Sequence, residues 1–155
     1  MDFSIRTASP DDAAAVAEVI SKAIRISCIA DHGNDEQKLS GWLADKSQTN
    51  VKFVIDVAPS GCFVAERAGA IVGFAAVSNG TLLQLYVDPD VSGLGIGRAL
   101  LETTEQCARD EGYKRITLDS TQTAQPFYGH MGYTDDSRPQ SAICGVICYP
   151  MKKSF

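Results

Sequence analysis

The sequence predicts one α/β domain of the α+β kind over residues 1–155: a mostly antiparallel central sheet with helices on both faces and one βαβ element. Three observations favour this fold class. Three strand-like runs follow one another between residues 62 and 87, as in an antiparallel meander. Amphipathic helical patterns precede and follow that meander. A chain of 155 residues is long enough for one hydrophobic core and too short for two full catalytic domains.

The segment before the meander is expected to contain one strand and two helices. Residues 3–7 alternate as a strand does. Residues 9–12 (Ser-Pro-Asp-Asp) provide an N-cap, a proline at the first helical position and two acids near the positive helix end. Apolar residues then recur at helical spacing as far as Ser27, and Asp35 is expected to cap a second helix. The pattern of residues 51–57 fits a helix and a strand equally.

The meander and the elements after it complete the predicted sheet. Asn79-Gly80 favours a type I′ turn, because both central residues of that turn need a positive φ. The residues expected to form strands are 62–66, 71–77, 82–87, 115–119 and 143–149. The helices expected after the meander are 99–108, which Gly112 ends, and 123–131, which Gly132 ends.

Composition and charge exclude several classes of protein. Hydrophobic residues make up 45% of the chain and charged residues 21%, which favours a folded globular protein over a disordered or coiled-coil one. The net charge of −5 lacks the basic excess of a nucleic-acid binder. No apolar run reaches the roughly 18 residues that a membrane span needs, and the first residues lack a signal-peptide pattern. We therefore expect a cytoplasmic protein with no nucleic-acid or membrane partner.

A glycine-rich loop, Ser92 to Gly97, links the last strand of the meander to a helix. Its three alternating glycines leave backbone N–H groups at the positive helix end open to an anion, so the loop is expected to bind a pyrophosphate rather than to form a plain turn. A P-loop requires lysine where Arg98 stands, and a dinucleotide-binding fingerprint requires glycine there. The dinucleotide alternative stays open through Asp119, which lies at a suitable distance along the chain for a ribose contact.

Two segments around this loop resemble the signatures of a known enzyme family. Residues 85–101 (LYVDPDVSGLGIGRALL) resemble the acetyl-CoA signature of the GCN5-related N-acetyltransferases (GNAT), and residues 124–133 (AQPFYGHMGY) resemble their second signature. Both occur in the family's order and separation, and the resemblance covers nearly the whole chain. It implies the GNAT fold. Ser92 and Leu94 depart from the family pattern, which has Gln or Arg at the first position and frequently a basic residue at the second.

The resemblance implies a site for acetyl-CoA as cosubstrate. The N–H groups of residues 93–98 would bind the pyrophosphate, the backbone of Leu85 and Val87 would pair with the pantetheine, and the Val87 N–H would point at the thioester oxygen. Thr121 takes the place of an asparagine that contacts the cofactor in many members. The expected cofactor-binding residues are Leu85, Tyr86, Val87, Gly93, Leu94, Gly95, Ile96, Gly97, Arg98, Thr121 and Phe127.

The resemblance also implies how the reaction is catalysed. Tyr128 would protonate the departing coenzyme A sulfur; the alternative is that it forms an ordinary aromatic core pair with Phe127. A primary amine of the lysine type has a pKa of about 10.4, so it must lose a proton before it attacks. The sequence names no clear base, and Glu66 and Asp119 are weaker candidates.

Asp31 and His32 are the expected acceptor-binding residues. They lie between the first two helices, in a loop that overlies the acceptor site in this family, and acids there would attract a cationic amine. The alternative is a capping loop with solvated charges. No metal is expected, because neither the spacing of Cys28 and His32 nor that of Cys144 and Cys148 is a strong ligand signature.

The sequence therefore predicts an N-acetyltransferase that moves an acetyl group from acetyl-CoA to a primary amine, in particular a small cationic one, by direct attack in a ternary complex. The acceptor would be a small molecule or a peptide amine, and nothing in the chain decides between a monomer and a homodimer. One alternative is a catalytically silent acyl-CoA-binding sensor module of the same fold. The other is an enzyme that uses a nicotinamide cofactor.

Overall fold

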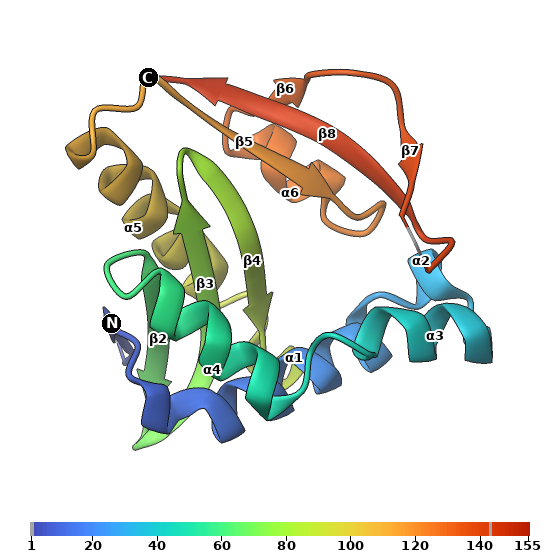
Figure 1. Ribbon diagram of the computed structural model, residues 1–155, viewed down its shortest axis with the longest axis horizontal. Helices are drawn as coiled ribbons and strands as arrows, with labels where there is room; N and C mark the ends of the chain where they lie inside the picture. Colours follow the sequence, from blue (N-terminus) through green and yellow to red (C-terminus); the bar gives the residue numbers. More distant parts are fainter. Residues whose placement is uncertain (1, 143) are drawn as a thin grey trace.

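The computed structural model describes residues 2–142 and 144–155, and the strands of these residues form one mixed sheet (Figure 1). The strand order is β1-β2-β3-β4-β5-β8-β6, and β7 pairs with β8. The described pairings are antiparallel except that of β4 with β5, which is parallel. In chain order the elements are β1 (Ser4–Thr7), η1 (Pro10–Asp12), α1 (Ala13–Ser27), α2 (Ile29–His32), α3 (Glu36–Leu43), α4 (Gln48–Val57), β2 (Cys62–Arg67), β3 (Ala70–Ser78), β4 (Thr81–Val87), η2 (Pro89–Val91), α5 (Ile96–Asp110), β5 (Arg115–Ser120), α6 (Gln125–His130), β6 (Thr134–Asp135), β7 (Gln140–Ser141) and β8 (Ile147–Ser154).

Side-chain caps fix where the N-terminal helices begin. The Ser9 hydroxyl accepts a hydrogen bond from the Asp11 N–H at 3.3 Å, and the Asp12 carboxylate accepts one from the Ser9 N–H at 2.7 Å. The predicted cap is therefore confirmed, and α1 follows directly after the 3₁₀ turn η1. The Asp35 carboxylate accepts hydrogen bonds from two N–H groups in the first turn of α3, each at 3.0 Å, as predicted.

Residues 51–57, whose pattern left helix and strand open, lie in the helix α4. The Ser47 hydroxyl caps this helix by accepting a hydrogen bond from the Asn50 N–H at 3.2 Å. Val51 and Ile55, four residues apart, bury their side chains in a cluster shared with α1. The cap and this apolar face together decide for the helix.

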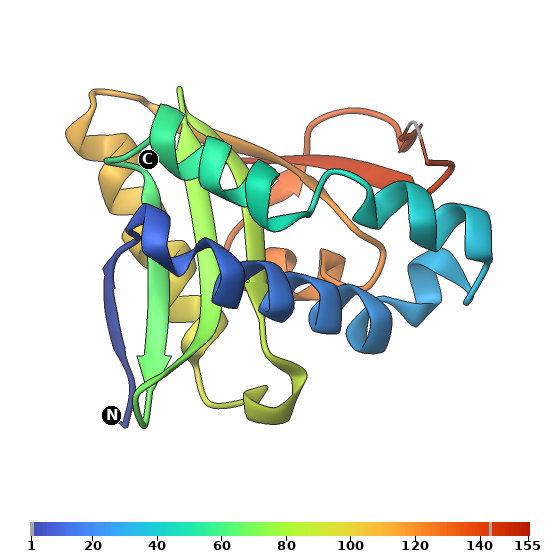
Figure 2. The ribbon, with the colours of Figure 1, turned by 60° about the horizontal axis from the view of Figure 1, so that its bottom comes forward.

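Helices cover both faces of the sheet, and the expected fold class is confirmed. Figure 2 shows α1 and α4 on one side of β2, β3 and β4, with α5 on the other. Val16, Ile20 and Ile24 of α1 are fully buried in one core cluster, and Leu100 of α5 is fully buried in another. Each amphipathic helix thus packs its apolar face on the sheet.

The predicted meander is present as β2, β3 and β4. Asn79 and Gly80 have φ values of 51° and 73°, as a type I′ turn requires. A register shift then interrupts the pairing of β3 with β4: Ala76 lies opposite Gln84, but Val77 lies opposite Leu82. The extra residue in β4 is a β-bulge.

The end of the chain differs from the prediction. The sequence predicts a last strand at residues 143–149, but β8 spans Ile147–Ser154, and Ile143 lies outside the described residues. A proline has no N–H to donate and usually ends a strand, yet Pro150 lies inside β8 opposite Asp119. Its carbonyl accepts a hydrogen bond from the Asp136 N–H at 2.9 Å. The two-residue strands β6 and β7 were also missed, because so short a strand has no periodic pattern.

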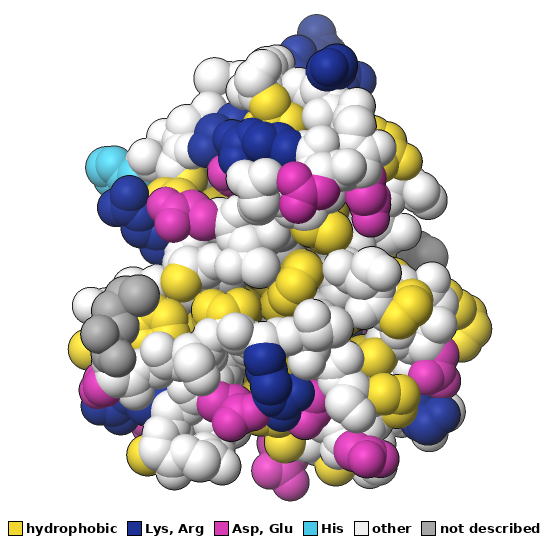
Figure 3. Space-filling view, turned by 90° about the vertical axis from the view of Figure 1, so that its left-hand side faces the viewer, with side chains coloured by type: hydrophobic (Ala, Val, Ile, Leu, Met, Phe, Trp, Pro, Cys, Tyr) yellow, Lys and Arg dark blue, Asp and Glu magenta, His cyan; other side chains and the backbone are white. Residues whose placement is uncertain are grey.

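The surface carries charges of both signs. On the face shown in Figure 3, acidic and basic side chains are interspersed above and below a central group of apolar ones. In the described part of the chain, no helix has both the length and the apolar character needed to cross a bilayer.

Candidate active site

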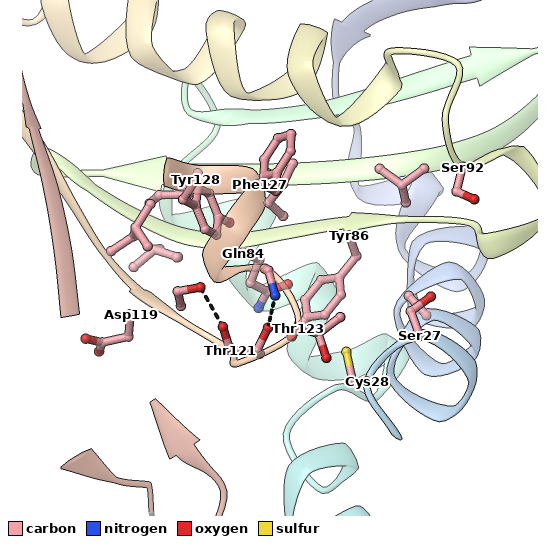
Figure 4. A pocket seen from close by; sticks show the side chains of 18 of the residues that line it. Ser27, Cys28, Gln84, Tyr86, Ser92, Asp119, Thr121, Thr123, Phe127 and Tyr128 are labelled. Atoms are coloured by element: carbon pink, nitrogen blue, oxygen red, sulfur yellow. Dashed lines mark hydrogen bonds between the residues drawn. The ribbon is translucent and has the colours of Figure 1, made fainter. Parts of the chain in front are cut away.

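Strands β4 and β5 diverge in the middle of the sheet (Figure 1), and a cleft lies between them (Figure 4). Within the described residues, these two strands pair in register only at Thr81 and Thr117, near the start of β4. Beyond that pair a cavity of about 370 Å³ lies between the two strands, the end of α1, and α6. Its lining includes six of the predicted site residues, namely Leu85, Tyr86, Val87, Thr121, Phe127 and Tyr128.

The bulge in β4 sets which side chains face each layer. Leu85 and Val87 pack in the cluster that contains the α5 residue Leu100, whereas Tyr86 packs in the cluster of α1 and α4. One edge of β4 pairs with β3, but beyond Thr81 the edge that faces β5 has no strand partner in the described part of the chain. Its backbone groups can therefore pair with an extended ligand, as an added strand would.

The glycine loop lies between this cleft and the start of α5. Gly93 and Gly95 have φ values of 80° and 87°, which residues other than glycine rarely adopt. Gly95 is the N-cap residue, so no side chain caps the first N–H groups of α5, and these groups lie at the positive helix end. A Cβ at Gly93 or Gly95 would meet nothing within 4 Å, so the space beside the loop is open. This arrangement fits a pyrophosphate.

The side chains of the loop add little charge to that site. Leu94 is 46% exposed, and Ile96 is buried in the core. The Arg98 guanidinium pairs with Glu102 on the next turn of α5, with the Arg98 Nε and a carboxylate oxygen 2.9 Å apart. The loop therefore binds an anion chiefly through its backbone.

Gln84 on β4 provides a second test of whether a ligand fits the cleft. Its side-chain oxygen is buried and has no hydrogen-bond partner among the described residues, and the residue lines the cavity. A buried acceptor without a donor costs free energy, about 1–3 kcal/mol in typical cases. A ligand that carries amide N–H groups, as pantetheine does, can supply the donor. Gln84 was not predicted from the sequence, because a single glutamine on a strand gives no signal of its own.

Tyr128 lies on α6 and its hydroxyl is turned toward the cleft (Figure 4). Phe127 and Tyr133 hold its ring in edge contacts, with centroid distances of 5.2 and 5.6 Å. Burial raises the pKa of the Tyr128 phenol well above its usual range, so the hydroxyl stays protonated at neutral pH. Tyr133 lies behind it and donates a hydrogen bond to Glu105 at 3.0 Å, within the core. The geometry suits Tyr128 as a proton donor.

Asp31 lies in the short helix α2 and contacts the loop between β5 and α6. Its carboxylate accepts hydrogen bonds from the Gln122 N–H at 2.6 Å and the Thr123 N–H at 3.3 Å, and it also bonds the Thr123 hydroxyl. In the same loop the Thr121 hydroxyl accepts a hydrogen bond from the Ala124 N–H at 3.1 Å. Asp31 and Thr121 therefore both shape the cleft wall that leads into α6.

His32 is 1% exposed, and both of its ring nitrogens are engaged. Nε2 lies 2.8 Å from the Ile24 carbonyl oxygen, and Nδ1 accepts a hydrogen bond from the Asn34 N–H at 3.0 Å. The ring meets Trp42 edge-on, at a centroid distance of 6.2 Å. Neither His32 nor Asp31 lines the cleft or the larger cavity of α3, β7 and β8 that adjoins it. Their part in acceptor binding stays a prediction. In this geometry they would act through the neighbouring segments that they hold in place, not by contact with the acceptor.

A second and larger cavity, of about 970 Å³, adjoins the cleft. It lies between α3 on one side and β7 with the first residues of β8 on the other. The two cavities share Tyr86, Asp119, Ser120 and Thr121 as lining residues. A ligand in the cleft and one in the larger cavity can therefore meet at this junction.

Comparison with known proteins places the chain in a family. Residues 31–155 match the family profile described as an acetyltransferase (GNAT) domain. The chain belongs to the GNAT family. An aminoglycoside N(6′)-acetyltransferase type 1 of Stenotrophomonas maltophilia is 34% identical over 131 residues, which cover 76% of this chain and 74% of that GNAT relative. The chain spans only 63% and 59% of the length of the first two curated relatives it matches.

Solved GNAT structures share the fold. A GCN5-related N-acetyltransferase from Rhodopseudomonas palustris superposes with a TM-score of 0.87 at 24% identity, covering 100% of this chain and 97% of that one. The PaiA N-acetyltransferase of Thermoplasma acidophilum, solved in complex with coenzyme A, has a TM-score of 0.79 at 20% identity and covers 100% of both chains. The GNAT fold implied by the sequence is thereby confirmed.

Sequence reasoning missed much of the second cavity. The sequence around Trp42 predicts a core contact. Its ring does pack on the core, but it also lines this cavity. Asp119 is one of the weaker base candidates in the sequence, yet it lines both cavities. Its alternation with the buried Leu118 and Ser120 is the signal that could have placed it on the open face of β5.

Proposed function

We propose that this protein transfers the acetyl group of acetyl-CoA to a primary amine by direct attack in a ternary complex. The observation that carries the proposal is the junction of the two cavities at Tyr86 and Asp119. One cavity suits an extended thioester between two strands, and the other has room for an acceptor. The aminoglycoside acetyltransferase similar to this chain supports an amine as the acceptor.

The residues that would bind acetyl-CoA come from two neighbouring segments, β4 and the glycine loop. The N–H groups of residues 93–98 would bind the pyrophosphate, and the free edge of β4 would pair with the pantetheine. The Val87 N–H would donate to the thioester oxygen, on which negative charge develops during attack. The Gln84 side-chain oxygen would accept a hydrogen bond from a pantetheine amide.

The reaction joins the amine nitrogen to the thioester carbon and breaks the carbon–sulfur bond. The ammonium first loses one proton to water, since only the neutral amine attacks. As the carbon–sulfur bond breaks, Tyr128 gives its proton to the sulfur. Tyr128 then regains a proton from the acylated nitrogen through water. The products are the N-acetyl amine, coenzyme A and one free proton.

Burial of Cys28 argues against a covalent acetyl-enzyme. Cys28 lines the cleft, and burial raises the pKa of its thiol to about 12. The thiolate that would attack a thioester is therefore scarce at neutral pH. A catalytically silent sensor module of the same fold is not favoured, because it would need no second cavity beside the thioester.

The proposal is tested by incubating the protein with acetyl-CoA and primary amines. Release of thiol is followed continuously, and mass spectrometry identifies the acylated product. We expect equal amounts of N-acetyl amine and free coenzyme A. Binding of acetyl-CoA in calorimetry without amine-dependent thiol release would instead indicate the sensor module. Titration with NADH, which we expect not to bind, checks the nicotinamide alternative.

A further inference from the structure

The second cavity has an apolar interior and a polar rim. Trp42 of α3 and Tyr86 of β4 contribute aromatic rings, and Val146 is 5% exposed. Ile147, at the start of β8, is an exposed apolar residue of the same lining. The polar side chains of Gln37 and Gln140 belong to exposed residues. A ligand that fills this space therefore meets mainly apolar surface inside, and hydrogen-bonding groups at the mouth and at the junction with the cleft.

Charge in the same cavity is nearly balanced. Asp45 pairs with Lys46, with the carboxylate oxygen and the ammonium nitrogen 3.0 Å apart. Asp119 is the remaining carboxylate of the lining, and within the described residues no lysine or arginine forms an ion pair with it. One positive charge of a ligand thus finds one partner, and further charges would lose hydration without gaining a partner.

The position of Asp119 decides which part of the ligand it meets. It lies on β5 where the two cavities join, so a group bound there is next to the thioester end of the cleft. The aromatic rings of Trp42 and Tyr86 favour an apolar or aromatic body beside that group, and they also attract a cation. The acidic residues near Asp31, from which the sequence predicts a cationic acceptor, line neither cavity. The preference for a cation at the junction therefore comes from Asp119 and the two aromatic rings.

We propose that Asp119 and Trp42 select the acceptor: a primary amine with one positive charge and an apolar or aromatic body. Asp119 holds the ammonium at the junction, and the body lies along Trp42 and Val146. The inference rests on the proposed function, because it takes the second cavity as the acceptor site. Polyamines and amino sugars fit this cavity less well, since their additional charges or hydroxyls face apolar walls.

The test compares three amines as acceptors: phenethylamine, spermidine and glucosamine. We expect kcat/KM for phenethylamine to exceed that for each of the others by about tenfold or more. Asp119→Asn, which keeps the shape of the side chain, should raise the KM of phenethylamine by about fivefold or more and leave the KM of acetyl-CoA within about twofold. Asp56→Asn removes the same charge from an exposed ion pair on α4, outside both cavities, and should change neither.

The remaining outcomes are distinguishable. Turnover with a preference for spermidine or glucosamine would overturn the inference and leave the proposed function standing. An equal rise in both KM values for Asp119→Asn would also overturn it, because the carboxylate would then act on the fold or on acetyl-CoA. Acetyl-CoA binding without turnover of any amine, across a wider panel of amines, would overturn the proposed function and the inference together.

Discussion

Tyr128 is the residue on which the chemistry depends most directly. Two aromatic contacts fix its ring, and its hydroxyl is turned toward the cleft where the sulfur of acetyl-CoA is expected. Because burial raises the pKa of this phenol, it remains a proton donor throughout the working pH range. A thiol with a pKa of about 8.5 is a fairly good leaving group, so the donor should help without being indispensable.

Tyr128→Phe should lower kcat by roughly 10- to 1,000-fold, because it removes the donor and keeps the ring. The affinity for acetyl-CoA should stay within about threefold. Steady-state kinetics and calorimetry measure the two quantities. Tyr113→Phe is the matched control, since Tyr113 lies outside both cavities and, within the described residues, its hydroxyl bonds only to Asn79. A kcat within about twofold of the wild type for Tyr128→Phe, with chemistry limiting, would make Tyr128 a packing residue.

At the scale of elements, the wall of the acceptor cavity depends on a close contact between α3 and the turn before β8. A Cβ placed on Gly41 would lie 2.7 Å from the Cys144 Cβ and 3.3 Å from its Cα. Only glycine allows this approach without a shift of one segment. A Cβ placed on Gly145 of the same turn would lie 3.8 Å from the Lys38 Cε of α3, an ordinary contact distance.

Gly41→Ala should therefore push α3 and this turn apart and disturb the acceptor cavity. We expect the KM of the amine to rise by about fivefold or more, with little change in the KM of acetyl-CoA, whose cleft lies on the other side of Tyr86. Overpacking of this kind typically costs about 1–3 kcal/mol of stability, which denaturant unfolding would measure. Gly129→Ala on α6, where an added Cβ meets nothing within 4 Å, is the control. An unchanged amine KM for Gly41→Ala would show that this contact does not shape the acceptor site.

Much of the fold could be predicted because local signals agree with it. The cap at Ser9, the Asn79-Gly80 turn and the glycine loop each specify backbone geometry through one or a few residues. The extension of β8 past residue 149 could not be predicted, since Pro150 is tolerated inside the strand through its place in the sheet rather than through its own preference. Local sequence does not contain that information.

The residues that line the cleft were easier to predict than those that line the second cavity. Residues 85–98 and 121–128 each form a continuous segment with a recognisable pattern, and the cleft brings the two segments together. The acceptor cavity combines α3, β4, β5 and the end of the chain, which are far apart in sequence. Asp31 and His32 show the consequence: their residue types suggested substrate contact, but the structure gives their side chains partners within the protein.

For the whole molecule, buried thiols link stability to pH. Burial raises the pKa of Cys28 to about 12 and that of Cys62 to about 11, whereas an unfolded thiol ionises near pH 8.5. As the pH rises above about 8.5, the unfolded state loses these protons and the folded state keeps them. The free energy of unfolding must therefore fall with rising pH in this range.

We expect the free energy of unfolding to decrease by about 1 kcal/mol or more per buried thiol between pH 8.5 and pH 10. Urea unfolding in the presence of a reductant measures it at each pH. Cys62→Ala should flatten the slope, since one of the two thiols is removed. A stability that stays constant to pH 10 would mean that these thiols ionise in the folded state as readily as in the unfolded one.

The central claim is that the amine in one cavity attacks acetyl-CoA in the adjoining cleft without a covalent acetyl-enzyme. Initial rates measured over a grid of acetyl-CoA and phenethylamine concentrations, or of another amine found to be a better acceptor, test it most directly. Direct attack requires both substrates to be bound at once, so the reciprocal plots should intersect, and no acetylated protein should be found after incubation with acetyl-CoA alone. Parallel reciprocal plots, together with an acetyl group on a cysteine such as Cys28, would contradict the account.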